Sequence, residues 1–340
     1  MRSEPERMCK GSTMSTHAAR SLRNSSPSGR ELDSEHQKLV RVAWLYYRDN
    51  LTQAEIAQQL HVSRPTVARL LERARQTGIV TIDIDTTGAG GLELINALRE
   101  KYHLRDVVIV PDLGEAASAE VSNTRLSIEA AQYMRRFLQP GAVIGVGWGD
   151  TVLRTLLALS PSSLNGVSFP TITGGIDAYT TKVSGTTNNG ISNYIRFVPA
   201  PLLASSPAIA SALRSERAVT SVLDMARASD VALIGIGGAI ASATILQTGV
   251  VTERQIRDYQ RRGAVGDILG EWYDEHGRVL AVDLQKIRVG LSISELRTMK
   301  HVVGVAGGID KLAAIHGALM GGYLNALITT EDVAHGLIDA

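Results

Sequence analysis

Between Gln53 and Arg73 the chain carries side chains that can hydrogen-bond to DNA. Arginine can bind the edge of guanine through two hydrogen bonds, and short polar side chains can bond to bases or phosphates. We expect Arg64, Thr66 and Arg69 to face bases. Arg73 and Gln53 suit the phosphate backbone, where contacts fix the register of the protein on DNA. The complete set of candidate DNA-binding residues is Gln53, Ser63, Arg64, Pro65, Thr66, Arg69 and Arg73.

Two glycine-rich segments could bind an anion through backbone amides. Each follows an apolar run and opens a helical stretch, and the candidates are Gly147, Trp148, Gly149, Asp150, Thr151, Gly307, Gly308 and Lys311. Glycine permits close approach, and the helix N-terminus supplies unpaired N–H groups, to which Thr151 adds a hydroxyl and Lys311 a charge. Phosphate is the expected anion. The alternative is a pair of tight turns in which the aspartates only cap helices.

Further candidates for binding a small molecule lie near other apolar runs. Gly174 and Gly175 follow the run 167–171, and Asp267 stands next to a glycine, where its carboxylate could accept a sugar hydroxyl. Asp267 suits a turn equally well, and Trp148 could stack on a sugar or simply pack in the core. Four histidines show no metal-ligand spacing with Cys, Asp or Glu, so no metal and no cofactor are expected: His276, His301, His316 and His335.

A dinucleotide-binding loop is a rival interpretation of Gly145, Gly147 and Gly149. Its third glycine comes two residues after the second, where three are needed. In addition, the next apolar run ends without the acid that would hold a ribose. We therefore set this alternative aside.

The elements that must position the candidate DNA-binding residues are two short helices joined by a turn. Thr52 and Glu55 have the spacing of a capping box, and Ser63 can cap a second helix that has Pro65 in its first turn. Two apolar sets at helical spacing are expected to be buried: Ala54, Ile56, Ala57 and Leu60, then Val67, Leu70, Leu71 and Ala74. The pattern predicts a helix-turn-helix, a DNA-binding motif.

The flanking sequence completes this predicted module over residues 36–85. An amphipathic helix precedes it, and residues 79–84 alternate as a short strand that would form a wing. Residues 1–35 begin in a Ser-, Arg- and Pro-rich stretch, and we expect a disordered extension there. Residues 86–91 are rich in glycine and are expected to form a linker.

Residues 92–340 alternate between apolar runs and helical stretches, which predicts an α/β domain with a Rossmann-like, doubly wound, mostly parallel sheet. The expected strands are 107–110, 142–146, 167–171, 194–198, 231–236, 279–281, 302–305 and 324–328. The expected helices include 118–138, 151–159, 207–227 and 310–320. In such sheets ligands bind beyond the carboxyl ends of the strands, where the glycine-rich segments lie.

Composition is typical of a globular protein of two domains, with 340 residues, 44% of them hydrophobic, and a formal net charge of +1. The single cysteine, Cys9, excludes an intrachain disulfide and fits a reducing cytoplasm. No apolar stretch is long enough to span a bilayer, so no membrane partner is expected.

Several motifs together strongly resemble the SorC family of bacterial sugar-responsive transcriptional regulators, from about residue 36 to residue 340. They are 51–57, 62–71, Gly147–Thr151, Gly263–Asp267, 303–311 and 327–331. The resemblance implies a winged helix-turn-helix and an effector domain similar to sugar-phosphate isomerases and glucosamine-phosphate deaminases. It also implies that this domain binds a phosphorylated sugar without converting it. Effector positions implied by the resemblance are Thr151, Gly174, Gly175, Asp267 and Lys311. Thr330 departs from the family, which often has aspartate there.

The favoured hypothesis is thus a DNA-binding regulator, a repressor, of carbohydrate-utilisation genes that responds to a phosphorylated sugar. Its expected partners are double-stranded operator DNA, the sugar, and further copies of the chain in a dimer or tetramer. An alternative is a phosphosugar isomerase or deaminase with an appended DNA-binding arm, for which Asp267 is the one candidate base. A ligand-independent architectural DNA binder is a third, less economical alternative.

Overall fold

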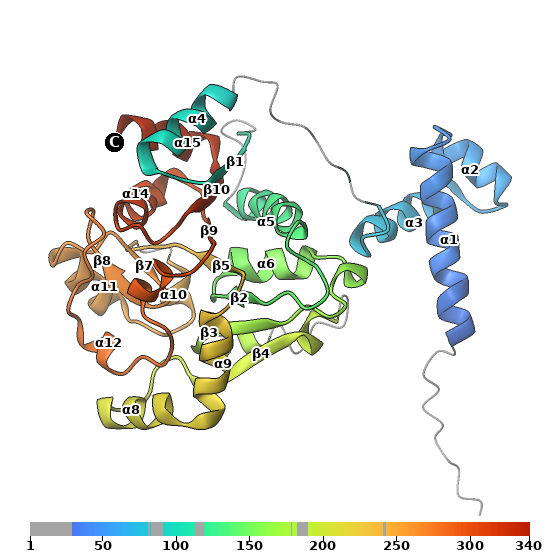
Figure 1. The fold of residues 1–340 in the computed structure, drawn as a ribbon. Coiled ribbons are helices and arrows are strands. Elements are labelled where there is room, and N and C mark those ends of the chain that lie inside the picture. The colour runs from blue at the N-terminus through green and yellow to red at the C-terminus, as the bar shows by residue number, and fades with distance from the viewer. Residues whose placement is uncertain are drawn as a thin grey trace, which may run out of the picture. The chain divides into compact units, whose positions relative to one another are not determined.

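A computed structural model describes residues 29–80, 82, 91–112, 119–177, 179–181, 190–240 and 243–340, without the side chains of residues 29–34. The chain divides into two compact units, residues 1–70 and 71–340, which are described separately. Figure 1 labels their helices and strands. No helix in the described ranges is both long and apolar enough to cross a bilayer.

The first unit is helical. It contains α1 (Gly29–Tyr47), α2 (Gln53–Gln59) and the first part of α3 (Arg64–Gln76). α1 begins at Gly29, so the end of the extension expected over residues 1–35 is helical, and residues 1–28 lie outside the described residues. Apolar side chains of each helix are buried: Leu39, Val42, Ala43, Leu45, Ile56, Ala57 and Val67.

One of the side chains expected to face inward does not. Ala54 is exposed and Leu60 is half-buried, whereas Ile56 is completely buried. Two residues correspond to about 200° around a helix, so Ala54 points to the side opposite Ile56.

The wing expected over residues 79–84 is only partly covered by the structure. Residues 79, 80 and 82 lie outside any strand, and the remaining residues of this segment are outside the described part of the chain. The same holds for the linker expected over residues 86–91, except that Gly91 begins a helix.

The second unit is built on a seven-stranded sheet in which all paired neighbours run parallel. In spatial order its strands are β1 (Asp106–Val110), β10 (Ala326–Thr330), β9 (Val302–Val305), β5 (Val231–Gly235), β2 (Ile144–Val146), β3 (Phe169–Gly175) and β4 (Ile195–Pro201). Each strand overlaps a predicted apolar run. The predicted α/β class with a mostly parallel sheet is therefore confirmed.

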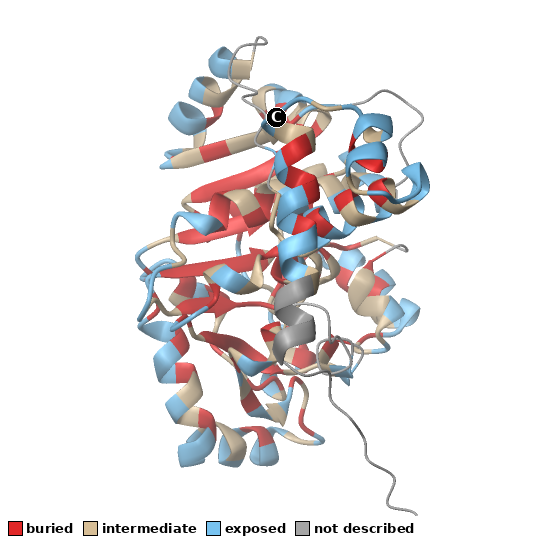
Figure 2. Cartoon of the chain, turned by 90° about the vertical axis from the view of Figure 1, so that its right-hand side faces the viewer, coloured by how far each residue is buried: buried red, intermediate tan, exposed pale blue. Residues whose placement is uncertain are grey.

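Helices cover both faces of this sheet, as the doubly wound prediction requires. The core on one face includes α5 (Ala119–Arg135) and α6 (Asp150–Ala158). The core on the other face includes α4 (Gly91–Tyr102), α9 (Arg217–Arg227), α14 (Leu312–Met320) and α15 (Glu331–Asp339). Residues of β5 alternate between the two cores. The inner strands of the sheet are almost entirely buried, whereas the edge strands β1 and β4 are partly exposed (Figure 2).

Shorter elements complete the unit. The helices are α8 (Pro207–Ser215), α10 (Thr244–Gln247), α11 (Glu253–Arg261), α12 (Asp283–Lys286), α13 (Ile293–Leu296) and the 3-10 turns η1 (Pro161–Ser163), η2 (Ile191–Asn193) and η3 (Ile309–Lys311). An antiparallel sheet comprises β6 (Gly237–Gly238), β7 (Gly266–Ile268) and β8 (Glu271–Tyr273).

Three local predictions were wrong. Residues 279–281 form no strand, because Val279 makes only an isolated bridge to Tyr273. The helix expected over 207–227 is two helices, since Glu216 adopts an extended conformation between α8 and α9. The helix expected to open at residue 310 begins at Leu312, after the 3-10 turn η3.

Candidate functional site

The predicted caps of α2 and α3 are present as hydrogen bonds. The Glu55 amide donates to the Thr52 hydroxyl at 3.3 Å, and the Thr52 amide donates to the Glu55 carboxylate at 2.8 Å. The hydrogen bonds from the side chain and backbone of Thr52 lower the pKa of Glu55. At the start of α3, the Thr66 amide donates to the Ser63 hydroxyl at 3.3 Å. Both helix starts are thereby fixed locally, as the sequence predicts.

α3 presents a basic surface. Arg64, Arg69 and Arg73 are exposed, while Val67 is buried on the other side of the helix. Glu72, the one acid of the helix, forms an ion pair with Arg75. With four arginines and one glutamate, α3 carries a net positive charge, and three of those arginines are among the residues proposed to contact DNA. Other candidates there are partly exposed Gln53 and Thr66 and exposed Ser63 and Pro65.

One candidate for base contact is already hydrogen-bonded within the protein. The Thr66 hydroxyl lies 2.8 Å from that of Ser63. A contact from Thr66 to a base would have to share or replace this bond. Arg64 and Arg69 are therefore the stronger candidates for direct base contact.

The second unit contains a pocket at the point where the order of the strands reverses. From β2 the chain continues to β3 and β4 on one side, whereas β5, β9 and β10 continue on the other. The pocket is lined by residues that follow β2 and β5, including Gly149, Asp150 and Gly237. This switch point is where open α/β sheets bind ligands.

One part of the pocket is suited to an anion. α6 begins at Asp150 after Gly149, which provides no side chain to cap the helix, and Thr151 is buried. The first amides of a helix have no acceptor within it. Lys311 reaches the same pocket and is the one cation among the described residues that line it. Asp150 is neutralised by Arg154, whose Nε donates to its carboxylate at 2.7 Å.

Asp267 provides a buried acceptor in the pocket. The residue is only 7% exposed to solvent, and its Oδ2 accepts a hydrogen bond from the Gly270 amide at 3.2 Å. Burial raises the pKa of the Asp267 carboxyl to about 6, although the Gly270 hydrogen bond and the positive charge of Lys311 act in the opposite direction. Its environment therefore favours a bonding partner that can donate a proton, such as a hydroxyl group.

The structure thus brings together six of the predicted effector residues along the pocket: Trp148, Gly149, Asp150, Thr151, Asp267 and Lys311. Five other predicted residues are not among its described lining residues: Gly147, Gly174, Gly175, Gly307 and Gly308. For two of these glycines, close packing against neighbouring protein atoms explains why a side chain would not fit. A Cβ at Gly174 would lie 2.2 Å from the Pro201 carbonyl oxygen, and one at Gly307 would lie 2.6 Å from Leu126.

Thr330, the departure from the family pattern, has a structural contact. Its hydroxyl accepts a hydrogen bond from the Gly308 amide at 3.3 Å. The segment from Gly307 to Lys311 is thus attached to the end of β10, and only Lys311 of this segment lines the pocket.

Trp148 contributes to the pocket wall and is itself held by protein groups. Its indole N–H donates to the Gly174 carbonyl at 2.8 Å, and its ring is nearly parallel to those of Tyr179 and Phe197. These contacts favour the packing alternative for Trp148. Tyr179 also lines the pocket, and burial together with the carboxylates of Asp150 and Asp267 raises its pKa.

Sequence reasoning missed several lining residues. They include Asn123, Tyr179, Thr244, Thr248 and Leu269. Thr244 and Thr248 are four residues apart, a spacing that places side chains on one helical face and could have drawn attention to them. Leu269 carries no comparable signal, because its position depends on a hairpin that the sequence analysis did not predict.

Comparisons with known proteins agree with this arrangement. The family described as "Putative sugar-binding domain" matches residues 88–339, and "Sigma-70, region 4" matches residues 44–77. The chain is 37% identical over 309 residues to the transcriptional regulator LsrR of Klebsiella pneumoniae subsp. pneumoniae, covering 90% of this chain and 94% of that protein. LsrR of Escherichia coli K12 is 38% identical over 308 residues, covering 89% and 95%.

A solved structure extends the similarity to the fold. The full-length sorbitol operon regulator SorC from Klebsiella pneumoniae matches with a TM-score of 0.66 and 28% identity, covering 89% of this chain and 98% of that one. These relatives are transcriptional regulators, which argues against the isomerase or deaminase alternative. The chain belongs to the SorC family of sugar-binding transcriptional regulators, with an N-terminal helix-turn-helix and a C-terminal sugar-binding domain.

Proposed function

We propose that this regulator is a repressor of carbohydrate-utilisation genes and that a phosphorylated sugar bound in the switch-point pocket releases it from its operator. The observation that carries the proposal is the composition of the pocket. The amides at the start of α6 and Lys311 suit a phosphate, while the buried carboxylate of Asp267 suits a sugar hydroxyl.

We assign DNA binding and effector binding to separate parts of the chain. Residues 36–85 read DNA through Arg64 and Arg69, with Arg73 on phosphates, and residues 92–340 bind the effector and form a dimer or tetramer. Ligand binding would alter the packing between subunits. That would change the separation of paired recognition helices relative to half-sites spaced by about one helical turn of DNA, or a multiple of it.

Calorimetry with matched sugars tests the effector part of this proposal. Glucose 6-phosphate, fructose 6-phosphate and ribose 5-phosphate are each compared with the unphosphorylated sugar. We expect at least one phosphosugar to bind while its unphosphorylated counterpart binds much more weakly. Equal binding of both members of every pair would contradict the phosphate assignment.

A further inference from the structure

The hairpin joining β7 to β8 has an unusual residue in its turn. Ile268 pairs with Glu271, so Leu269 and Gly270 are the two central residues. Both have positive φ, 57° for Leu269 and 78° for Gly270, as a type I′ turn requires. Asparagine or glycine normally occupies the first position, because a branched apolar side chain is strained there. Leucine at this site calls for a compensating interaction.

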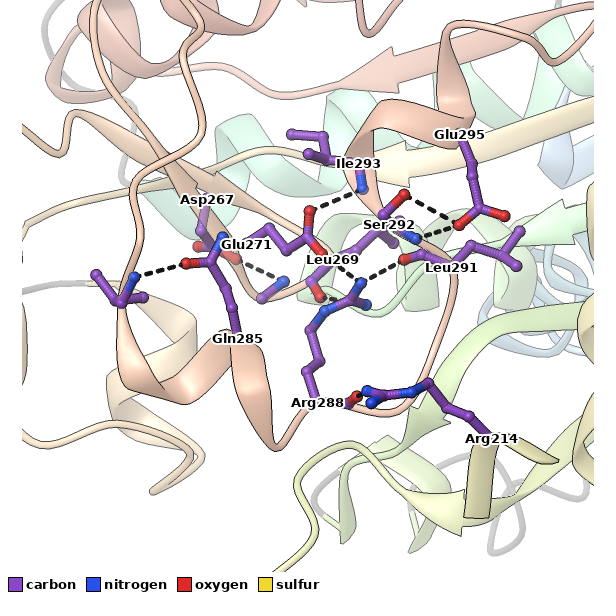
Figure 3. A network of polar contacts seen from close by, with 12 residues as sticks. Arg214, Asp267, Leu269, Glu271, Gln285, Arg288, Leu291, Ser292, Ile293 and Glu295 are labelled. Carbon is purple, nitrogen blue, oxygen red and sulfur yellow. Dashed lines mark hydrogen bonds and ion pairs between the residues drawn. The ribbon is translucent and has the colours of Figure 1, made fainter. Parts of the chain in front are cut away.

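A buried ion pair holds this turn in place (Figure 3). Arg288 donates through Nη2 to the Glu271 carboxylate at 2.6 Å and through Nη1 to the Leu269 carbonyl at 3.3 Å. The second carboxylate oxygen of Glu271 accepts from the Ile293 amide at 2.9 Å, and Arg288 is 4% exposed. The turn, through Leu269, and β8, through Glu271, are thus tied to the segment after α12, which limits the relaxation of the strained turn.

The side chain of Leu269 lies where a ligand would contact it. Leu269 lines the pocket and is only half-buried. Its Cδ2 packs over Gly147, since a Cβ added there would lie 3.1 Å away. Gly147, predicted to cradle an anion, instead leaves room for this side chain. Asp267, in β7 of the same hairpin, accepts a hydrogen bond from the Gly270 amide, so one hairpin provides an apolar surface and a buried acceptor.

We propose that Leu269 contacts the effector by packing against a face of the sugar that presents C–H groups and few hydroxyls. Asp267 accepts a hydrogen bond from a hydroxyl of the same molecule. The inference rests on the proposed function and specifies the chemistry of the site. Arg288 and Glu271 act as positioning residues, because they hold the turn without lining the pocket. On this proposal, leucine is kept at position 269 despite its strained backbone, because asparagine or glycine there could not make the apolar contact with the sugar.

The test uses the full-length protein and substitutions at two positions with positive φ. Leu269→Ala keeps the strained backbone without the apolar side chain, Leu269→Gly removes both, and Leu269→Met keeps an unbranched apolar side chain. His103 also has positive φ, 55°, is exposed, and lies outside the pocket, so His103→Ala and His103→Gly are matched controls. Glucose 6-phosphate, fructose 6-phosphate and ribose 5-phosphate are titrated by calorimetry, and unfolding temperatures are measured without sugar.

We expect Leu269→Ala and Leu269→Gly to weaken phosphosugar binding about tenfold, corresponding to partial loss of one buried leucine contact. Leu269→Met keeps an apolar side chain and should bind more tightly than Leu269→Ala, and both His103 variants should bind as the wild type does. At each position the glycine variant should have a higher unfolding temperature than the alanine variant.

Wild-type affinity in Leu269→Ala and Leu269→Gly would overturn the inference while leaving the proposed function intact. Equal unfolding temperatures for the alanine and glycine variants at position 269 would also overturn it, since the turn would then not be strained. Absence of phosphosugar binding by the wild type would be a separate result that contradicts the proposed function and, with it, the inference.

Discussion

The basic face of α3 and the pocket beside β2 and β5 bring polar groups together in different ways. Arg64, Arg69 and Arg73 lie on one helix and are exposed. The pocket instead collects Asp267 from β7 and Lys311 from η3, which are brought together by the sheet. Exposed charges on one helix can be recognised from local spacing, whereas a pocket depends on how distant segments pack.

The same contrast applies to charge. The arginines of α3 can remain hydrated until they meet DNA, so their presence costs little folding energy. Asp267 is desolvated in the folded protein, and its pKa is raised to about 6. We therefore expect substitutions in the pocket to change stability, pH dependence and effector binding, and substitutions of the exposed α3 arginines Arg64, Arg69 and Arg73 to change DNA binding alone.

Asp267→Asn should produce the largest change. Because the pKa of the carboxyl is about 6 in the folded protein and ordinarily 3.8, the folded state binds the proton more tightly. Wild-type stability should therefore fall by about 3 kcal/mol as the pH rises through this interval, whereas asparagine cannot ionise and should show no such loss. Urea denaturation between pH 4 and pH 7.5 measures the difference. An identical pH profile in the variant would show that Asp267 is not the titrating group.

Lys311→Ala should impair effector binding in the pocket without impairing DNA binding by α3. Loss of a charge-assisted contact with phosphate should weaken phosphosugar binding by roughly 10- to 100-fold, since such bonds contribute about 1.5–3 kcal/mol. DNA affinity without sugar should stay unchanged. Lys300→Ala is the control, because Lys300 is exposed and pairs with Asp230 outside the pocket. Normal calorimetric binding by Lys311→Ala would remove this residue from the phosphate site.

Arg69→Ala and Arg73→Ala, both in α3, should have different effects on DNA binding. Loss of a base contact at Arg69 should cost about 1–3 kcal/mol and relax preference at one operator position. Arg73→Ala should weaken binding to all sequences and reduce the salt dependence by about one phosphate contact. Mobility-shift titrations on operator and scrambled duplexes at several salt concentrations measure both effects. If Arg69→Ala retained both affinity and sequence preference, Arg69 would not read bases.

The helix-turn-helix could be predicted closely because its determinants are local. Thr52 and Glu55 form the predicted capping box, and Ser63 caps α3. In the second unit, apolar runs located all seven strands of the main sheet, since buried parallel strands are continuously apolar. The strand predicted over the apolar run 279–281 was wrong because a short apolar segment can also pack as a loop.

The pocket could be predicted only in part. Trp148, Thr151 and Lys311 were found because glycine-rich strand ends are visible in sequence. Gly174 and Gly307 were included by the same rule, yet each makes room for neighbouring protein atoms. Leu269 was missed because its relevance depends on a positive φ and on a buried ion pair between distant residues, neither of which produces a periodic pattern.

Control of DNA binding by the pocket is tested most directly by a mobility-shift titration of the full-length protein on duplexes from its own promoter region at low ionic strength. We expect a complex that forms preferentially on particular sequences. It should dissociate when a phosphosugar shown to bind by calorimetry is added, but not when the unphosphorylated counterpart is added. Failure to bind any such duplex, or a complex indifferent to that phosphosugar, would contradict the claim that the pocket controls DNA binding by α3.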